Sequence, residues 1–402
     1  MKEKLKRIWA YVSDAGRVKR FASYVLVAAA ASALTVAVLL PTVARKMALS
    51  NNKLTILSAL IEERYIGDAD MTKVEDAAAH AMISATGDRW SFYIPASEMG
   101  AYMEQKENAY VGIGITITRQ EDDSGIYISA VTPGGSAEEA GILAGDVIVA
   151  VDGQSSSEIG FDAMSDLIRG EEGTQVTLTI LRDGTQQDIV VTRKRIQTPV
   201  AIGTLLEGNI GLVEIVNFNA NCAKETVAAI EALRQQGAEK LIFDVRFNPG
   251  GYAHEMVELL DYLLPEGDLF RTVEYTGKES VEKSDASCLN MPMMVLVNGS
   301  SYSAAEFFAA ALEEYGAAKI VGEQTSGKGF YQVTYTLPDG SGVALSIGKY
   351  YTPNGKCLEG IGLTPNVVVP VDEATAAAIY AGTLDPAADP QIQKAIAVLN
   401  QQ

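Results

Sequence analysis

Residues 294–308 read MVLVNGSSYSAAEFF, and this stretch decides the class of the fold. It predicts an apolar strand, Met293–Asn298, that runs through a loop of small residues into a helix, Ala304–Tyr315. Strand and helix patterns alternate in the same way from about residue 200 to about residue 370. Such alternation is typical of a layered α/β core. Ser303 comes at the helix start, where the helix dipole favours developing negative charge, although serine is also a common N-cap.

Residues 322–332 read GEQTSGKGFYQ and place Lys328 between two glycines, directly after a short predicted strand. The glycines let the backbone approach closely and leave the lysine as the only side chain there. If this lysine is buried, desolvation disfavours its ammonium form, and the neutral amine can act as a general base. Lys328 is therefore a candidate partner for a nucleophilic serine.

Residues 241–251 read LIFDVRFNPGG, which predicts a strand that ends in a Gly-Gly turn at the start of a helix. Backbone N–H groups at such a turn are available to donate to an oxyanion. Gly250 and Gly251 are therefore candidate oxyanion-hole residues. Together, the three segments supply the nucleophile, the base and the donors that acyl transfer through a serine requires.

Other interpretations of these segments meet obstacles. Gly322–Lys328 matches the Walker A pattern, but Gly329 stands where that pattern needs Ser or Thr, and a strand follows instead of a helix. The chain has two histidines, His80 and His254, and no G-x-S-x-G elbow surrounds a serine. His254 follows the Gly-Gly turn and stays open as an alternative base. Because Glu258 stands where H-E-x-x-H needs its second histidine, no metal site is expected there.

Residues from about 109 to 194 predict short strands between Gly-rich turns, and so a small β-barrel with two helices. Residues 110–117 read YVGIGITI, and glycines at alternate positions let backbone N–H groups turn toward one carboxylate. With VTPGGSA at 131–137 and AGILAGDVI at 140–148, the segment resembles the PDZ domain, which binds extended peptides and often their C-termini. The resemblance implies a carboxylate site at Gly112, Ile113 and Gly114.

The barrel and the three core segments together resemble the C-terminal processing peptidases, a Ser–Lys family that carries a PDZ domain. The family pattern S-A-S-A-S-E aligns with residues 301–306, and G-x-x-T-x-G-K-G-x-x-Q aligns with residues 322–332. The resemblance implies that Ser303 is the nucleophile, Lys328 is its base and Gln332 orients the lysine. It extends over roughly residues 54–370.

The same resemblance implies oxyanion donors from Gly250 or Gly251 and from Ala304. It also implies an α+β or α/β multidomain fold, in which a PDZ-like β-barrel accompanies a ClpP/crotonase-like protease core. Arg169 matches a family I-R-G-x-x-G turn and is a candidate sensor that reports PDZ occupancy to the core, with a solvated surface arginine as the alternative. Two residues depart from the pattern: Tyr302 replaces an alanine beside the nucleophile, and would narrow the substrate site, and Ala305 replaces a serine.

The charge distribution separates the N-terminus from the rest of the 402 residues. The formal net charge of −19 argues against a nucleic-acid-binding protein. Residues 1–20 nevertheless hold seven Lys or Arg against two Asp or Glu, and the 24 residues Phe21–Ala44 hold no charge. This stretch is long enough to span a bilayer, and the basic cluster predicts a cytoplasmic N-terminus. A cleaved signal peptide is the alternative, and either way the body is expected outside the cytoplasm, in a bacterial envelope.

The three cysteines, Cys222, Cys288 and Cys357, show no CxxC spacing, so a zinc site is not expected. One disulfide among them is left open, since sequence does not select a pair. The chain is expected to divide into a basic tail (1–20), a transmembrane anchor (21–44), a helical segment (45–100), a PDZ domain (101–195), a peptidase core (196–370) and a C-terminal helical segment (371–402).

We therefore expect a membrane-anchored serine endopeptidase that hydrolyses extracytoplasmic proteins near their C-termini and needs no cofactor. Its expected partner is a protein or peptide whose C-terminus binds the PDZ domain, and no nucleic acid is expected. The helical ends at 45–85 and 371–402 are candidates for homodimer contacts. The alternative is a catalytically inactive or partner-activated PDZ scaffold that keeps the fold and binds peptide C-termini.

Overall fold

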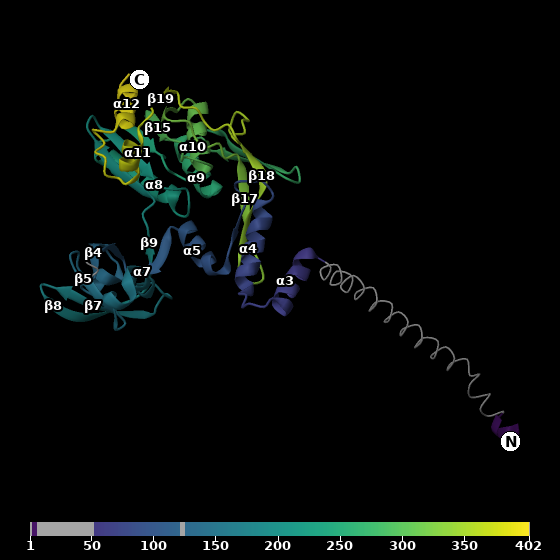
Figure 1. The fold of residues 1–402 in the computed structure, drawn as a ribbon. Coiled ribbons are helices and arrows are strands. Elements are labelled where there is room, and N and C mark those ends of the chain that lie inside the picture. Colours follow the sequence, from purple (N-terminus) through teal and green to yellow (C-terminus); the bar gives the residue numbers. More distant parts are fainter. Residues whose placement is uncertain (1, 6–51, 121–124, 402) are drawn as a thin grey trace. The chain divides into compact units, whose positions relative to one another are not determined.

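The computed structural model describes residues 2–5, 52–120 and 125–401 (Figure 1). They belong to two compact units, Met1–Gly87 and Asp88–Gln402. In the first unit, helices α3 (Lys53–Arg64) and α4 (Met71–Ser84) begin at the side-chain caps Asn52 and Asp70. The predicted span at 21–44 lies outside the described residues. None of the helices that the structure describes is long and apolar enough to cross a membrane.

The second unit begins with strand β1 (Phe92–Ile94) and helix α5 (Ala96–Lys106), followed by a β-rich domain. Its main sheet has the order β3-β4-β5-β7-β8. The turn Asp183-Gly184 has φ of 50° and 78°, which suits a two-residue hairpin and fixes the register of β7 on β8 at Arg182 opposite Thr185. The elements are β2 (Ala109–Gly112), β3 (Ile115–Arg119), β4 (Ile126–Val131), α6 (Ser136–Glu139), β5 (Val147–Val151), β6 (Gln154–Ser155), α7 (Ser156–Ile168), β7 (Gln175–Arg182), β8 (Thr185–Thr192) and β9 (Lys194–Gln197).

A six-stranded sheet of order β10-β11-β12-β15-β16-β19 forms the centre of the α/β core. The strands β11, β12, β15, β16 and β19 are parallel, and β10 is antiparallel to β11. Every residue of β15 is buried, as expected for a central parallel strand that reads as a continuous apolar run. The strands are β10 (Ala201–Leu206), β11 (Ile210–Ile215), β12 (Lys240–Asp244), β15 (Met293–Val297), β16 (Ala318–Gly322) and β19 (Val367–Val368).

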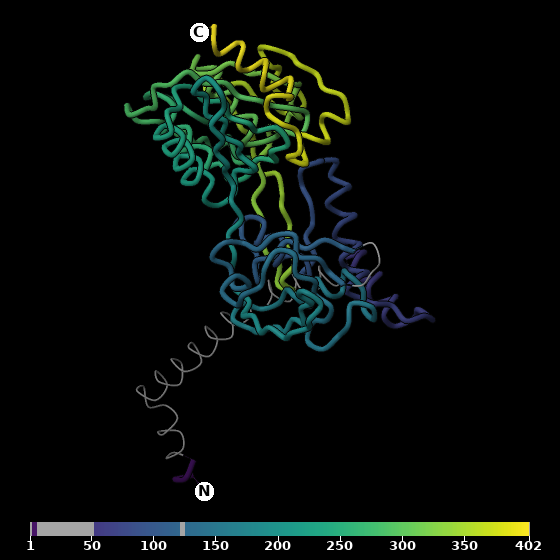
Figure 2. Tube along the Cα trace, turned by 90° about the vertical axis from the view of Figure 1, so that its left-hand side faces the viewer, coloured from purple at the N-terminus to yellow at the C-terminus, as the bar shows by residue number. Residues whose placement is uncertain are grey.

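Helices cover both faces of this sheet because successive strand residues point to opposite sides. On one face, Val295 packs with helices α8 (Cys222–Gln235), α9 (Ala253–Leu263) and α10 (Ala304–Glu314). On the other face, Met294 packs with helix α12 (Pro390–Leu399). The C-terminal segment, with α11 (Glu373–Tyr380) and α12, thus ends against the core (Figure 2). The predicted mixed α/β, multidomain class is confirmed.

A second, antiparallel sheet was not predicted. It has the order β1-β18-β13-β14, with β17 on β18, and comprises β13 (Gly267–Glu274), β14 (Glu279–Ser284), β17 (Phe330–Thr336) and β18 (Gly342–Tyr351). Strand β1 pairs with β18 through Phe92 opposite Ala344. Strand β17 begins two residues after Lys328, so this sheet holds one side of the loop that carries the candidate base.

Candidate active site

Three loops meet at the edge where the parallel strands β12, β15 and β16 end, which is where α/β sheets commonly carry their sites. The N–H of Tyr302 donates to the carbonyl oxygen of Asn248 at 3.1 Å, and the N–H of Ser326 donates to that of Ser301 at 3.2 Å. The three segments singled out in the sequence are therefore adjacent in space.

Ser303 lies at the N-terminus of α10, as predicted, and is 6% exposed. Its φ of 59° and ψ of −126° are unusual for a residue with a side chain. Backbone strain of this kind persists only where the surrounding structure enforces it, and it is concentrated at functional sites. The position presents Ser303 at the positive end of the helix dipole.

A buried carboxylate, Glu306, connects the nucleophile loop with the base loop. It accepts the N–H groups of Ser303 at 3.0 Å, Gly327 at 2.8 Å and Lys328 at 2.8 Å, and the hydroxyl of Thr325 at 2.5 Å. Burial raises the pKa of Glu306, while these hydrogen bonds oppose the rise. The sequence alone did not predict a role for this residue. The signal was its place three residues after the N-cap serine, the spacing of a capping box.

Lys328 has the electrostatic properties expected of a general base. Burial is the largest cause that lowers its pKa, to about 8 from 10.5, and the positive charge of Lys106 adds to the effect. Three carboxylates oppose it, namely Asp88, Glu359 and Glu306. Its Nζ lies 5.0 Å from the ring centre of Trp90 and 5.8 Å from that of Tyr302. A base that loses its proton near neutral pH is suited to activate a serine.

Among the described residues, Lys328 and Gln332 make no hydrogen bond to the groups on which they are predicted to act. Within the described chain, no hydrogen bond joins Lys328 Nζ to Ser303 Oγ, and such bonds commonly tighten only when substrate is bound. The Nε2 of Gln332 donates to Ser346 Oγ at 2.9 Å and to the carbonyl oxygen of Phe330 at 3.1 Å. The orienting role of Gln332 stays a prediction.

The oxyanion loop packs directly against the nucleophile. A Cβ added to Gly250 would lie 2.8 Å from Ser303 Cβ and from the N of Ala304, so the position requires glycine. The N–H of Gly250 already donates to Asn248 Oδ1 at 2.8 Å. No acceptor among the described residues binds the N–H of Gly251 or of Ala304. Of the three predicted donors, Gly251 and Ala304 are therefore the ones available to an oxyanion.

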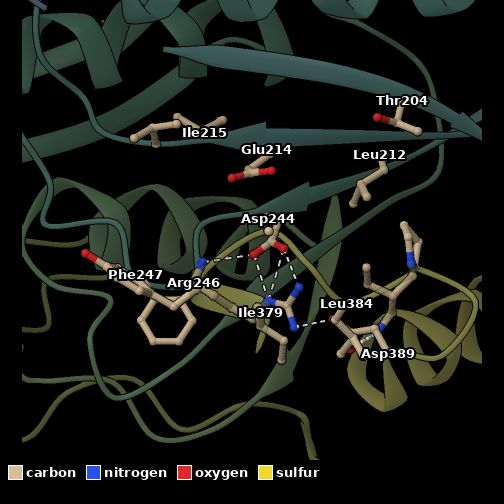
Figure 3. Close-up of a pocket in the computed structure, with 15 residues that line it drawn as sticks. Thr204, Leu212, Glu214, Ile215, Asp244, Arg246, Phe247, Ile379, Leu384 and Asp389 are labelled. Atoms are coloured by element: carbon tan, nitrogen blue, oxygen red, sulfur yellow. Dashed lines mark hydrogen bonds and ion pairs between the residues drawn. The ribbon is translucent and has the colours of Figure 1, made fainter. Parts of the chain in front are cut away.

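An ion-pair network holds the start of this loop (Figure 3). The guanidinium of Arg246 donates to Asp244 at 2.5 to 3.0 Å and to Asp389 at 2.8 Å. Asp389 belongs to the C-terminal segment, and the side chains of Arg246 and Asp389 are each 3% exposed. A pocket of about 270 Å³ adjoins the network and is lined by neither Ser303 nor Lys328. The C-terminal segment therefore anchors the residue that precedes the oxyanion loop.

The predicted peptide site lies in the PDZ-like domain. Gly112, Ile113 and Gly114 line a groove of about 180 Å³ with residues of β3 and of α7. The carbonyl oxygens of Ile113 and Gly114 accept the N–H groups of Ala137 and Thr132, which turns them toward the body of the domain. Arg169 is exposed and lines the same groove. Arg169 thus lines the groove where a peptide is predicted to bind, and its role as a sensor stays a prediction.

The alternative base is placed less favourably. The side chain of His254 is 71% exposed and stacks on Tyr252 with ring centres 5.1 Å apart. The three cysteines, Cys222, Cys288 and Cys357, are not joined by a disulfide. Trp90 and Glu359, for which the sequence predicts no role, also lie at the base loop. The Nε1–H of Trp90 donates to Glu359 at 3.1 Å.

Two parts of the chain match known protein families. Residues 209–369 match Peptidase family S41, and residues 127–182 match the PDZ domain. The carboxy-terminal processing protease CtpA of Bacillus subtilis is 33% identical over 310 residues, which make up 76% of this chain and 66% of that protein. The carboxyl-terminal-processing protease of Synechocystis sp. is 30% identical over 318 residues, 77% of this chain and 74% of that protein.

A solved structure, a putative S41 protease from Bacteroides fragilis, supports the fold alone. It aligns with a TM-score of 0.50 at 16% identity and covers 86% of this chain and 96% of its own. This chain spans 66% of the length of the Bacillus subtilis protein, slightly less than two thirds.

Proposed function

Because this chain belongs to peptidase family S41, we propose that it is a serine endopeptidase that hydrolyses peptide bonds by acyl transfer through Ser303. The observation that carries the proposal is the placement of Ser303 and Lys328 around the buried carboxylate of Glu306. The adjacent Gly250-Gly251 turn is proposed to supply the third component, because Gly250 packs against the nucleophile and the N–H of Gly251 is left for an oxyanion.

In the proposed reaction, neutral Lys328 accepts the proton of Ser303 Oγ as the oxygen attacks the scissile carbonyl carbon. The N–H groups of Gly251 and Ala304 bind the oxyanion of the tetrahedral intermediate. The ammonium of Lys328 then donates its proton to the leaving amine, and the acyl-enzyme remains on Ser303. Water, deprotonated by Lys328, then attacks the ester carbon, and the ammonium returns that proton to Ser303 Oγ as the carboxylic acid product leaves. Gln332 is proposed to orient the amine of Lys328 once substrate is bound.

The substrate is proposed to be a protein or peptide with a free C-terminus. The glycine-rich loop and the apolar groove of the PDZ-like domain suit an extended chain that ends in a carboxylate. Binding there raises the local concentration of the substrate at the catalytic site, so cleavage near the C-terminus is favoured. Free and C-terminally amidated forms of one peptide test this, and equal kcat/KM values would contradict it.

The protein is proposed to be a single-pass membrane protein with its catalytic body outside the cytoplasm. The support is the uncharged stretch Phe21–Ala44 behind a basic N-terminus. Fractionation of cells, followed by protease accessibility of the intact protein, tests both statements. Recovery of the body on the cytoplasmic face would contradict the proposed topology.

The catalytic proposal is tested on the full chain in detergent with casein as substrate. Wild type is compared with Ser303→Ala and Lys328→Ala, and with His254→Ala as a matched control outside the proposed machinery. We expect both catalytic variants to lose activity by at least about a thousandfold, and His254→Ala to retain it. Cleavage by Ser303→Ala at the wild-type rate, or no cleavage by any form, would contradict an active Ser–Lys peptidase.

A further inference from the structure

The residue before the nucleophile, Tyr302, lies over the candidate base. Its ring stacks on that of Trp90, with centres 5.8 Å apart and an interplanar angle of 27°. The amine of Lys328 lies beside both rings, 5.0 Å from the centre of Trp90 and 5.8 Å from that of Tyr302. We propose that Tyr302 is a positioning residue for this base: with Trp90 it forms an aromatic wall that keeps water from the amine of Lys328. The inference rests on the proposed function, in which Lys328 is the base.

The Trp90 half of the wall is fixed to both sides of the lysine. Its Nε1–H donates to the two oxygens of Glu359 at 3.1 and 3.2 Å, and Glu359 also accepts the N–H of Gly329 at 2.7 Å. On the other side, the guanidinium of Arg89 lies 4.2 Å from the centre of the Trp90 ring and donates to the carbonyl oxygen of Gly327 at 2.8 Å. Trp90 is thus tied to the two glycines that flank the lysine.

The Tyr302 half is fixed by its own backbone. The N–H of Tyr302 donates to the carbonyl oxygen of Asn248, and the preceding residue, Ser301, is fully buried and donates its hydroxyl to the carbonyl oxygen of Val245 at 2.7 Å. Burial raises the pKa of the Tyr302 phenol, as expected for a ring partly enclosed in the site. An alanine at this position, as in the related sequence pattern, would leave that side of the amine open.

The charged groups around Lys328 do not explain by themselves why its amine loses a proton readily. Lys106 of α5 favours the neutral amine. Three carboxylates favour the ammonium: Asp88 before β1, Glu306 of α10 and Glu359 of the loop before β19. The aromatic faces also attract the ammonium. Since the pKa of Lys328 is nevertheless lowered to about 8, burial outweighs these attractions. Opening the wall is therefore expected to raise the pKa of Lys328.

The first test is the pH dependence of kcat/KM for the full chain. Tyr302→Ala is expected to move the rising limb upward by on the order of one pH unit, so that kcat/KM near neutral pH falls about tenfold while the limit at high pH is retained. Tyr302→Phe keeps the ring and is expected to retain the wild-type profile. Tyr275→Ala removes an aromatic side chain that is 77% exposed, and is the matched control.

The second test does not depend on peptidase activity. The titration of Lys328 is followed by NMR in the full chain with ¹³C at lysine Cε, in a Ser303→Ala background, with Lys328→Arg to assign the signal. An upward shift in the Tyr302→Ala form supports the wall even if no substrate is found, in which case only the proposed function fails. Tyr302→Leu, expected to give an intermediate shift, replaces Tyr302→Ala if that variant does not fold.

Two outcomes would overturn the inference. One is a Lys328 titration that is the same in the wild-type and Tyr302→Ala backgrounds. The other is an increase in KM on Tyr302→Ala with an unmoved pH profile, because Tyr302 would then be a contact for substrate and not a wall for the base.

Discussion

The backbone N–H groups of Ser303 and Lys328 meet at one atom, Oε2 of Glu306, at distances of 3.0 and 2.8 Å. The buried carboxylate of Glu306, in α10, thereby holds the loop of the nucleophile and the loop of the base together. The carboxylate can do this because an ionised oxygen accepts several hydrogen bonds at once.

Glu306→Gln tests this connection. The glutamine has the same shape, but its NH₂ group faces donors on every side, and at least one buried N–H or hydroxyl loses its acceptor. We expect a loss of about 1–3 kcal/mol in the free energy of unfolding and a fall of at least about a hundredfold in kcat. Urea unfolding and casein cleavage measure the two effects, with the exposed Glu207→Gln as control. Wild-type kcat in Glu306→Gln would show that the connection is not needed.

The activity is expected to follow the ionisation of Lys328. Because burial lowers the pKa of Lys328 to about 8, kcat/KM should rise about tenfold per pH unit below that value and level off above it. Initial rates in a series of buffers at constant ionic strength measure this rise of kcat/KM with pH. A rise of kcat/KM with pH that is lost in His254→Ala and kept in Lys328→Ala would assign the base to histidine instead.

Lys328 is also expected to cost stability. In the unfolded chain it holds its proton up to 10.5, and in the folded protein only up to about 8. The unfolded state therefore binds more protons between these values, and the free energy of unfolding should rise with pH across that window. At neutral pH, Lys328→Met is expected to stabilise the fold by about 2–3 kcal/mol while it abolishes activity.

Unfolding by urea at several pH values measures the free energy of unfolding of wild type and of Lys328→Met, with the exposed Lys224→Met as control. A Met variant no more stable than wild type would contradict the burial of the amine.

Gly250 should tolerate no side chain. Its φ is 80°, and an added Cβ would lie 2.8 Å from Ser303 Cβ and from backbone atoms of the nucleophile loop. We expect Gly250→Ala to displace that loop and to lower kcat at least about a hundredfold. Gly184→Ala is a matched control, since Gly184 has a φ of 78° and open space around it. It should cost about 1 kcal/mol of stability with no loss of activity. An equal fall of kcat in Gly250→Ala and Gly184→Ala would mean that backbone strain alone, and not contact with the nucleophile loop, lowers the activity.

Asp389 is expected to stabilise the core through its ion pair with Arg246, whereas Asp372, also in the C-terminal segment, is not. Both Asp389 and Asp372 cap helices, and asparagine replaces either as a cap at little cost. Only Asp389 also pairs with Arg246 in a buried site. We expect Asp389→Asn to lower the free energy of unfolding by about 2–3 kcal/mol and Asp372→Asn by less than about 0.5 kcal/mol. Equal losses would show that capping, not the ion pair, matters.

The parallel core was predictable because its strands carry their signal locally. The run MMVLV of β15 is apolar at every position, and glycine-rich loops follow β12 and β16. Parallel strands that end at one edge bring their loops together, so the neighbourhood of Ser303, Lys328 and Gly250 followed from the strand order. The family match of residues 209–369 covers the same region.

The antiparallel sheet and the details of the site were not predictable in this way. Strand β14 reads ESVEKS and is mostly exposed, so its pattern is weak, and β1 is only three residues long. The wall of Trp90 and Tyr302 depends on pairing between segments far apart in the chain. The contacts of Gln332 depend on side-chain conformation, which residue type does not determine. The capping-box spacing of Glu306 from Ser303 is visible in the sequence. Its buried hydrogen bonds to the base loop depend on the tertiary structure and are not.

The pairing of β1 with β18 has a consequence for how the protein comes to be active. Ser91 Oγ accepts the N–H of Ser346, a contact across 255 residues. Contacts of such long range close large loops and form slowly, and a chain made from its N-terminus has no β18 until Gly342–Tyr351 have been synthesised. Arg89 and Trp90 lie just before β1, which begins at Phe92, so they are expected to reach Lys328 only once β18 is present. The surroundings of the base would therefore be completed later than those parts of the core that precede β18 in the sequence.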